Sequence, residues 1–220
     1  MSQVSALAEH ASKFKMAPSQ QLQQEVELIK SSAPDFFNMY VADHTGTTVA
    51  FHPPVNEKGE STIGLNFSDR PYFEKMLKTG GPVVSNIFVA RGGVFSPTVT
   101  LSVPILVEGS VVGYALGALD HSGIQRFLQS HGQGKQVFAT VVDAEGKTIA
   151  STFPGRTTMQ EVLERKSGAR DYLTETSYRW TPTDKKPSVI RWQNSFLVEE
   201  TELGKVLPWR LLIEAPMQHR

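Results

Sequence analysis

The chain of 220 residues contains no cysteine, which excludes disulfide bonds, thiolate catalysis and zinc sites built on thiolates. It has no excess of charge of either sign, because 22 basic side chains balance 22 acidic ones. No net field therefore attracts nucleic acid or an anionic membrane. No apolar run approaches the length of a membrane span, and the residues after Met1 form no secretion signal. These absences predict a soluble chain without a nucleic-acid partner.

Catalytic and metal-binding motifs are scarce as well. The six histidines are scattered, and none forms the i, i+4 pair of a helical metal site. The sequence has no Gly-x-Ser-x-Gly elbow, no glycine-rich phosphate loop and no EF-hand spacing. His44 lies on a predicted turn, where a surface role is far commoner than catalysis. We expect no catalytic residue, no metal and no cofactor, and therefore no enzyme.

What the sequence does contain is an internal repeat. Residues 41–50 (VADHTGTTVA) return at 141–150 as VVDAEGKTIA, with five identities. Each copy holds an Asp-x-x-Gly, starting at Asp43 and at Asp143. This is a hairpin signal, because Asp bonds the turn backbone and Gly accepts a positive φ. The repeat predicts two related modules of about a hundred residues each.

Two helices are expected before the first strand. The first has an apolar stripe and ends near Pro18, and the second begins at Ser19 and ends at Pro34. The stripe of the first helix consists of Val4, Leu7, Ala11 and Phe14, and that of the second of Leu22, Val26, Ile29 and Ala33. Because no N-cap precedes the first stripe, we expect this helix to be the lower end of a longer stalk.

The remaining pattern predicts one plan used twice. In the first module we expect strands over 36–41, 48–51, 83–89, 97–106 and 110–119, with a helix capped by Ser68 and closed at Gly80. A hairpin at Glu108-Gly109 joins the last two strands. A connecting helix over 122–130 leads to the second module, with strands over 177–181, 188–198 and 206–214 and a helix opened by Thr158 and Glu161.

The strand over 97–106 has one polar and one apolar face. Thr98, Thr100 and Ser102 alternate with three apolar residues, and we expect this strand to be central in the sheet. The polar face either lines a cavity or faces water, as one face of an antiparallel sheet can. In the next strand, Gly113 and Gly117 indicate close packing against a neighbouring element.

Residues 66–73 (NFSDRPYF) carry the densest binding chemistry in the chain. Arg70 can offer two parallel donors to a carboxylate, and the start of a helix adds positive potential. The alternative is that Arg70 pairs with Asp69 or another acid on the surface while Tyr72 and Phe73 fill the core. Asp120, which follows the strand over 110–119, either faces a ligand or caps the next helix.

Taken together, these motifs resemble the double Cache (dCache) sensor domain, the tandem PAS-like region of bacterial sensor histidine kinases, diguanylate cyclases and chemoreceptors. The resemblance rests on the N-terminal helix, the repeated hairpin, 69–73 (DRPYF), the strand over 99–105 and 113–120 (GYALGALD). It implies an α+β fold, with a long N-terminal stalk helix followed by two PAS-like modules, each a central antiparallel sheet flanked by helices. The implied division is 1–34 stalk helices, 35–120 membrane-distal module, 121–133 connecting helix and 134–220 membrane-proximal module.

The same resemblance implies a non-catalytic sensor region that binds a small molecule in the membrane-distal module. In amino-acid-sensing members an Arg-x-aromatic-aromatic segment holds the ligand carboxylate and a later Asp holds the ammonium. Here Arg70, Tyr72 and Phe73 match the first and Asp120 the second, so an amino acid or related amine is favoured over a dicarboxylate. The expected ligand-binding residues are Arg70, Tyr72, Phe73, Phe88, Arg91, Thr100, Ser102, Tyr114 and Asp120.

Further expectations concern the whole protein. The resemblance implies a membrane-anchored receptor whose sensor region lies in the periplasm or outside the cell, attached to the bacterial inner membrane. A homodimer through the N-terminal helix is a further expectation, and in the second module we expect no ligand or one of a different kind. The alternative is a ligand-free module of such a receptor that dimerises or docks another protein.

Overall fold

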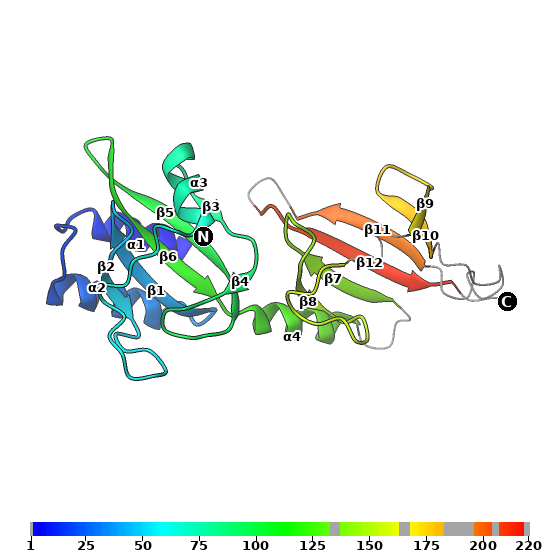
Figure 1. Cartoon of the computed structure of the whole chain (residues 1–220), viewed down its shortest axis with the longest axis horizontal. Helices are drawn as coiled ribbons and strands as arrows, with labels where there is room; N and C mark the ends of the chain where they lie inside the picture. The colour runs from blue at the N-terminus through cyan, green and yellow to red at the C-terminus, as the bar shows by residue number, and fades with distance from the viewer. Residues whose placement is uncertain (1, 133–136, 163–167, 183–195, 204–206, 218–220) are drawn as a thin grey trace. The chain divides into compact units, whose positions relative to one another are not determined.

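The computed structural model of the chain describes residues 2–132, 137–162, 168–182, 196–203 and 207–217. The chain divides into two compact units, Met1–Asp120 and His121–Arg220 (Figure 1). Each unit contains one antiparallel sheet, with three described helices beside the first and one beside the second, so the fold is α+β, as predicted.

The sheet of the first unit has the strand order β2-β1-β6-β5-β3. Its strands are β1 (Phe36–Asp43), β2 (Thr48–His52), β3 (Val83–Val84), β5 (Pro97–Val107) and β6 (Ser110–Leu119), and the short β4 (Phe88–Val89) also pairs with β5. The strand predicted over 83–89 is therefore two short strands separated by 85–87. β5 is paired on both sides, with β6 on one side and with the short β3 and β4 on the other, so it lies inside the sheet, one strand from its edge.

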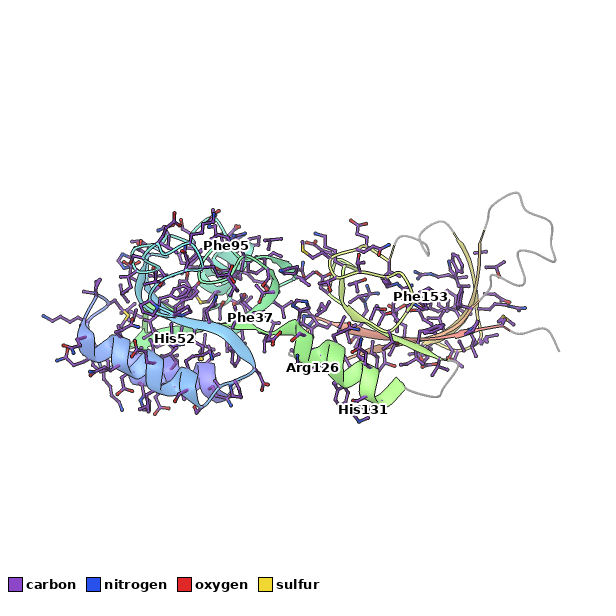
Figure 2. The ribbon with its side chains drawn as sticks, turned by 90° about the horizontal axis from the view of Figure 1, so that it is seen from below. Phe37, His52, Phe95, Arg126, His131 and Phe153 are labelled. Atoms are coloured by element: carbon purple, nitrogen blue, oxygen red, sulfur yellow. The ribbon has the colours of Figure 1, made fainter. Side chains whose placement is uncertain are left out.

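Two short helices cover one face of this sheet. α1 (Ser2–Ala11) packs on β5 and β6, and α2 (Gln20–Ser31) packs on β1 and β2 (Figure 2). The side chain of Ser19 caps α2 by accepting a hydrogen bond from Leu22 N at 3.2 Å, as predicted. The described chain thus begins with helices of ten and twelve residues and not with one long stalk. None of its described helices is long and apolar enough to cross a bilayer.

Neighbouring elements pack closely on Gly113 and Gly117, as predicted, and at Gly117 one of these neighbours is α1. A Cβ at Gly117 would lie 2.5 Å from Phe36 Cδ1 and 2.9 Å from Val4 Cγ2. A Cβ at Gly113 would lie 2.3 Å from the carbonyl oxygen of Ala42. Val4, with Leu7 and Ala11, is fully buried within the unit, so the apolar stripe of α1 faces its own sheet.

α3 (Pro71–Thr79) contributes to the opposite face of the sheet. Its residues Tyr72 and Met76 belong to a core cluster with Leu116 and Ala118 of β6. Gly80 ends the helix in the left-handed conformation at φ 62°, as predicted. Ser68 does not cap α3, because its hydroxyl donates to Asn66 Oδ1 at 2.6 Å. The helix instead begins with a proline, whose fixed φ suits the first helical position.

The second unit also has a six-stranded sheet, in which β8-β7-β12-β11 repeats the order β2-β1-β6-β5 of the first. Its order is β8-β7-β12-β11-β10-β9, and α4 (His121–Gly132) packs on β7 and β8. The strands are β7 (Phe138–Val142), β8 (Thr148–Ser151), β9 (Gly168–Tyr172), β10 (Ser177–Pro182), β11 (Phe196–Glu202) and β12 (Arg210–Pro216). The predicted strand residues 188–195 and 206 lie outside the described residues, and β9 was not predicted.

The helix predicted from Thr158 and Glu161 is wrong over the described residues 158–162, which form turns and a single bridge. Met159 has a φ of 67°, which a right-handed helix does not allow. The side chain of Gln160 accepts a hydrogen bond from Thr157 N at 2.9 Å and so replaces the predicted capping pair.

The repeated Asp-x-x-Gly forms the same turn in both units. Asp43 Oδ1 accepts from the backbone N–H groups of Thr45 at 2.8 Å and Thr47 at 3.1 Å. Asp143 Oδ1 accepts from the residues two and four positions later at 2.9 Å each. The glycines have φ values of 85° and 82°. The repeated sequence therefore forms a turn of the same geometry in both units, as predicted.

Candidate ligand-binding site

A small cavity of about 20 Å³ lies in the first unit, on the face of the sheet that α3 covers. Its lining comes from β1, β4, β5, β6, the start of α3 and the loop before β5. The lining residues are Asn38, Tyr40, Phe67, Arg70, Tyr72, Phe88, Ala90, Arg91, Gly92, Thr98, Thr100, Leu116 and Ala118. Most of the wall is aromatic or aliphatic, with a few polar groups, which is the usual composition of a small-molecule site.

Arg70 reaches this cavity from the N-cap position of α3. Its backbone is extended, with φ −83° and ψ 135°, and its carbonyl accepts from Phe73 N at 2.9 Å. The guanidinium carbon lies 5.0 Å from the ring centroid of Phe88, a cation–π distance. Its Nε is buried without a hydrogen-bond partner. No carboxylate among the described residues forms an ion pair with Arg70, so its charge is available to an anion.

The neighbouring acid is held by the other arginine. Asp69 accepts from Arg91 at 2.7 Å (Nη1 to Oδ2) and 2.5 Å (Nη2 to Oδ1), and Arg91 Nη2 also donates to the carbonyl of Asn66 at 2.8 Å. Hydrogen bonds from Arg91 lower the pKa of Asp69. The alternative pairing of Arg70 with Asp69 is therefore not formed. Arg91 lines the cavity, but its charge is balanced by Asp69.

Three tyrosines form a hydrogen-bonded group in this core. The hydroxyl of Tyr40 lies 3.1 Å from that of Tyr72 and 3.5 Å from that of Tyr114. Burial raises the pKa of Tyr72 to about 12 and raises the pKa of Tyr40 and Tyr114 well above the usual value. All three phenols are consequently neutral at physiological pH, and each has one O–H to donate.

The polar face of β5 lies in this buried region and not in water. Thr98, Thr100 and Ser102 are at most 2% exposed, which decides the open question about this face. Thr98 Oγ1 donates to the carbonyl of Leu119 at 2.9 Å, whereas Thr100 Oγ1 and Ser102 Oγ have no partner. Such atoms are rare in native proteins, where a buried polar group generally has a hydrogen bond.

Asn38 on β1 adds a third unpaired atom to the residues that line the cavity, after those of Arg70 and Thr100. Its Nδ2 donates to the carbonyl of Gly92 at 3.0 Å, and its Oδ1 is buried without a partner. Gly92 can approach this closely because it lacks a side chain. A Cβ there would lie 2.8 Å from Phe67 Cζ.

Five of the predicted binding residues line the cavity, and four do not. The five are Arg70, Tyr72, Phe88, Arg91 and Thr100; the other four are Phe73, Ser102, Tyr114 and Asp120. Phe73 and Tyr114 pack together behind it, with ring centroids 5.6 Å apart. Asp120 lies beyond the end of β6, where its N–H donates to the carbonyl of Asp35 at 2.7 Å. Sequence reasoning missed Asn38, Tyr40, Phe67, Ala90, Gly92, Leu116 and Ala118, whereas Thr98 belongs to the polar strand face for which a cavity was one of the two expectations.

The second unit has a different arrangement at the matching place on its sheet. Asn38 pairs with Ala118 in the first sheet, and Phe138 pairs with Glu214 in the second, so Glu214 matches Ala118. Glu214 is 0% exposed and forms an ion pair with Arg156, whose side chain is 3% exposed. Arg156 also donates to Thr140 Oγ1 at 2.7 Å.

An aromatic ring covers this ion pair. The guanidinium carbon of Arg156 lies 4.3 Å from the ring centroid of Phe153, which is labelled in Figure 2. An internal ion pair therefore occupies the position that faces the cavity in the first unit. The sequence showed no counterpart of Arg70 in this unit, and the buried pair was not predicted.

Comparison with known proteins identifies the fold. No protein-family model matches the chain, and no curated protein matches it in sequence. Among solved structures, the ligand-binding domain of the Pseudomonas fluorescens chemoreceptor CtaA in complex with L-isoleucine is similar with a TM-score of 0.70 and 14% identity, over 97% of this chain and 82% of that one. The sensor domain of the V. cholerae histidine kinase DctB is similar with a TM-score of 0.63 and 17% identity, over 99% and 86%.

An extracellular ligand-binding receptor from Desulfohalobium retbaense is similar with a TM-score of 0.70 and 17% identity. The match covers 97% of this chain and only 36% of that receptor, so the chain spans about a third of its length. The chain therefore has the double Cache fold that its sequence resembles, with two PAS-like units in tandem.

Proposed function

We propose that this chain is the extracytoplasmic ligand-binding region of a transmembrane signalling receptor. In this proposal the first unit is membrane-distal and binds a small carboxylate-bearing molecule, and the second unit is membrane-proximal. The region has no catalytic role of its own. It lies in the periplasm or outside a bacterial cell, and the membrane anchor and signalling output belong to other parts of the protein. Support comes from the fold, because the similar solved structures are sensor or ligand-binding domains.

The observation that carries the proposal is that Arg70 borders the cavity without an ion-pair partner among the described residues. Its guanidinium has no carboxylate partner among the described residues, its Nε is buried and unbonded, and it borders a cavity lined by hydrogen-bonding groups. A carboxylate fits this site because the planar fork of an arginine can donate two parallel hydrogen bonds to it. The start of α3 adds the positive end of the helix dipole.

Amino acids are the ligand class implied by the family resemblance, and CtaA is described in complex with four of them, L-isoleucine, L-leucine, L-serine and L-alanine. For this chain that preference relied on Asp120 as the partner of an ammonium group, and Asp120 is not among the lining residues. The proposal therefore requires only the carboxylate.

Homodimerisation remains a prediction. It would need residues of α1 other than Val4, Leu7 and Ala11, because these are fully buried within the first unit. A ligand-free docking module would have no use for unpaired polar atoms around a cavity, so the ligand-binding proposal accounts for more of the structure.

The experiment is a thermal-shift screen of small carboxylates, followed by calorimetric titration of the hits. A ligand at about 100 times its dissociation constant stabilises the protein by roughly 2.7 kcal/mol, which is easily detected. Arg70→Met should weaken binding by at least about 30-fold, since loss of one partner of a buried charge pair costs roughly 2–5 kcal/mol. The matched control is Lys78→Met on the same helix, an exposed cation paired with Glu74. Equal affinity of Arg70→Met and wild type would overturn the proposal.

A further inference from the structure

The charges around the cavity are unequal. Of its thirteen lining residues two are cationic, Arg70 and Arg91, and none is Asp or Glu. Arg91 is already paired with both oxygens of Asp69. The cavity therefore presents one uncompensated positive charge and no negative charge.

The single free positive charge and the absence of a negative one limit which charged groups the rest of the ligand can carry. An ammonium group moved from water into this wall would meet no carboxylate, and an unpaired buried charge is strongly unfavourable. The phenols of Tyr40 and Tyr72 cannot serve as anions, because burial raises the pKa of both. A second carboxylate on the ligand would likewise need a second free cation, which the described lining does not provide.

Uncharged hydrogen-bonding groups are available instead. The amide of Asn38 is oriented by its N–H bond to Gly92, so its Oδ1 can only accept a hydrogen bond. The hydroxyl of Thr100 can donate or accept and has no partner. Both residues are cross-strand neighbours of Ala118, one on each side of it. Ala118 contributes only a methyl group to the wall between them, whereas Glu214 carries a long side chain at the matching position in the second unit.

We propose that the ligand is a short hydroxycarboxylic acid, with one carboxylate at Arg70 and an uncharged hydroxyl donor at Asn38 and Thr100. This inference rests on the proposed function and narrows its ligand class. A hydroxyl gives Asn38 Oδ1 the donor that it lacks and introduces no second charge. The aromatic and aliphatic wall suits a small apolar remainder.

Matched acids test the inference by calorimetry on the whole chain. The hydroxy members are lactate, 2-hydroxybutanoate and 3-hydroxybutanoate, and their amino partners are alanine, 2-aminobutanoate and 3-aminobutanoate. Propanoate and butanoate lack the second group, and malonate carries a second carboxylate. The best hydroxy acid should bind at least tenfold more tightly than its amino partner and than malonate. It should bind about 2- to 10-fold more tightly than the unsubstituted acid, which corresponds to one hydrogen bond.

A substitution in the wall should reverse the preference. Thr100→Asp places a carboxylate of similar size where the unpaired hydroxyl is, so the amino member of each pair should now bind more tightly than the hydroxy member. Thr100→Val, which keeps the shape without the charge, should weaken the hydroxy acid and give the amino acid no advantage. Circular dichroism checks the fold, and Asn38→Asp replaces Thr100→Asp if the latter does not fold.

The outcomes separate this inference from the proposed function. If an amino acid or malonate binds wild type at least as tightly as the best hydroxy acid, and Arg70→Met abolishes that binding, the inference fails and the proposed function stands. An unchanged order of affinities in a folded acidic variant also overturns the inference. If no carboxylate in the series binds, both fail.

Discussion

The buried ion pair between Arg156 and Glu214 gives a specific prediction for stability. Its side chains are 3% and 0% exposed, so Arg156→Met leaves a carboxylate in the interior without its partner. Breaking a buried pair from one side costs about 3–5 kcal/mol. We expect the free energy of unfolding of the second unit to fall by this amount. With a urea m value of about 1.5 kcal/mol per M, the midpoint falls by roughly 2–3 M.

Tryptophan fluorescence follows this unit separately. All three tryptophans of the chain, Trp180, Trp192 and Trp209, lie after residue 120, in the second unit. Urea titration monitored at their emission therefore reports on the unit that holds the ion pair. Far-ultraviolet circular dichroism of the same samples follows both units together.

Two further variants determine whether the effect comes from the buried charge. Arg179→Met breaks an ion pair with Asp171 whose side chains are 31% and 62% exposed, and it should cost less than about 1 kcal/mol. The double variant Arg156→Met with Glu214→Leu removes both charges and should recover most of the lost stability. The reasoning is refuted if Arg156→Met costs no more than Arg179→Met, or if the double variant is as unstable as the single one.

Three other predictions concern the scaffold. Gly117→Ala should lower the free energy of unfolding by about 1–3 kcal/mol, because the new Cβ would lie 2.5 Å from Phe36. The control is Gly123→Ala in α4, whose Cβ would meet no atom closer than 3.8 Å and which should be neutral or stabilising. Chemical denaturation measures the stability of both variants. Above pH 10 the free energy of unfolding should fall as pH rises, because burial raises the pKa of Tyr72 to about 12 and the folded state therefore holds the phenol proton more tightly than the unfolded state. Tyr72→Phe should lose roughly 2–3 kcal/mol less than wild type between pH 10 and 12. An equal dependence of stability on pH in the two proteins would contradict this. Asp43→Ala removes two backbone hydrogen bonds and one from the hydroxyl of Thr45, and it should cost about 1–2 kcal/mol by thermal denaturation; an unchanged stability would count against the turn role.

Local signals in the sequence predicted much of the scaffold. Ser19 before an apolar stripe, the Asp43 turn and the Glu108-Gly109 hairpin each encode their geometry within a few residues, and the structure contains all three. The helix expected from Thr158 failed because a capping pattern says nothing about the φ that the chain needs at the next residue, Met159.

The candidate site was predicted only in part, because it depends on register and long-range pairing. Arg70 and Tyr72 were recognisable from chemistry concentrated in a short segment. Asn38 became part of the cavity only because β1 pairs with β6 in a register that places it beside Ala118. Asp120 shares the alternation of β6 with Ala118, but the strand ends at Leu119, before Asp120. The pairing of Asp69 with Arg91, 22 residues away, carries no local signal.

The most direct test of the ligand-binding account is a crystal structure of the chain with the carboxylate that binds it most tightly. The account predicts electron density for the ligand inside the cavity of the first unit, with its carboxylate oxygens about 2.7–2.9 Å from the guanidinium nitrogens of Arg70. Ligand density elsewhere, or a carboxylate in this cavity without contact to Arg70, would contradict it.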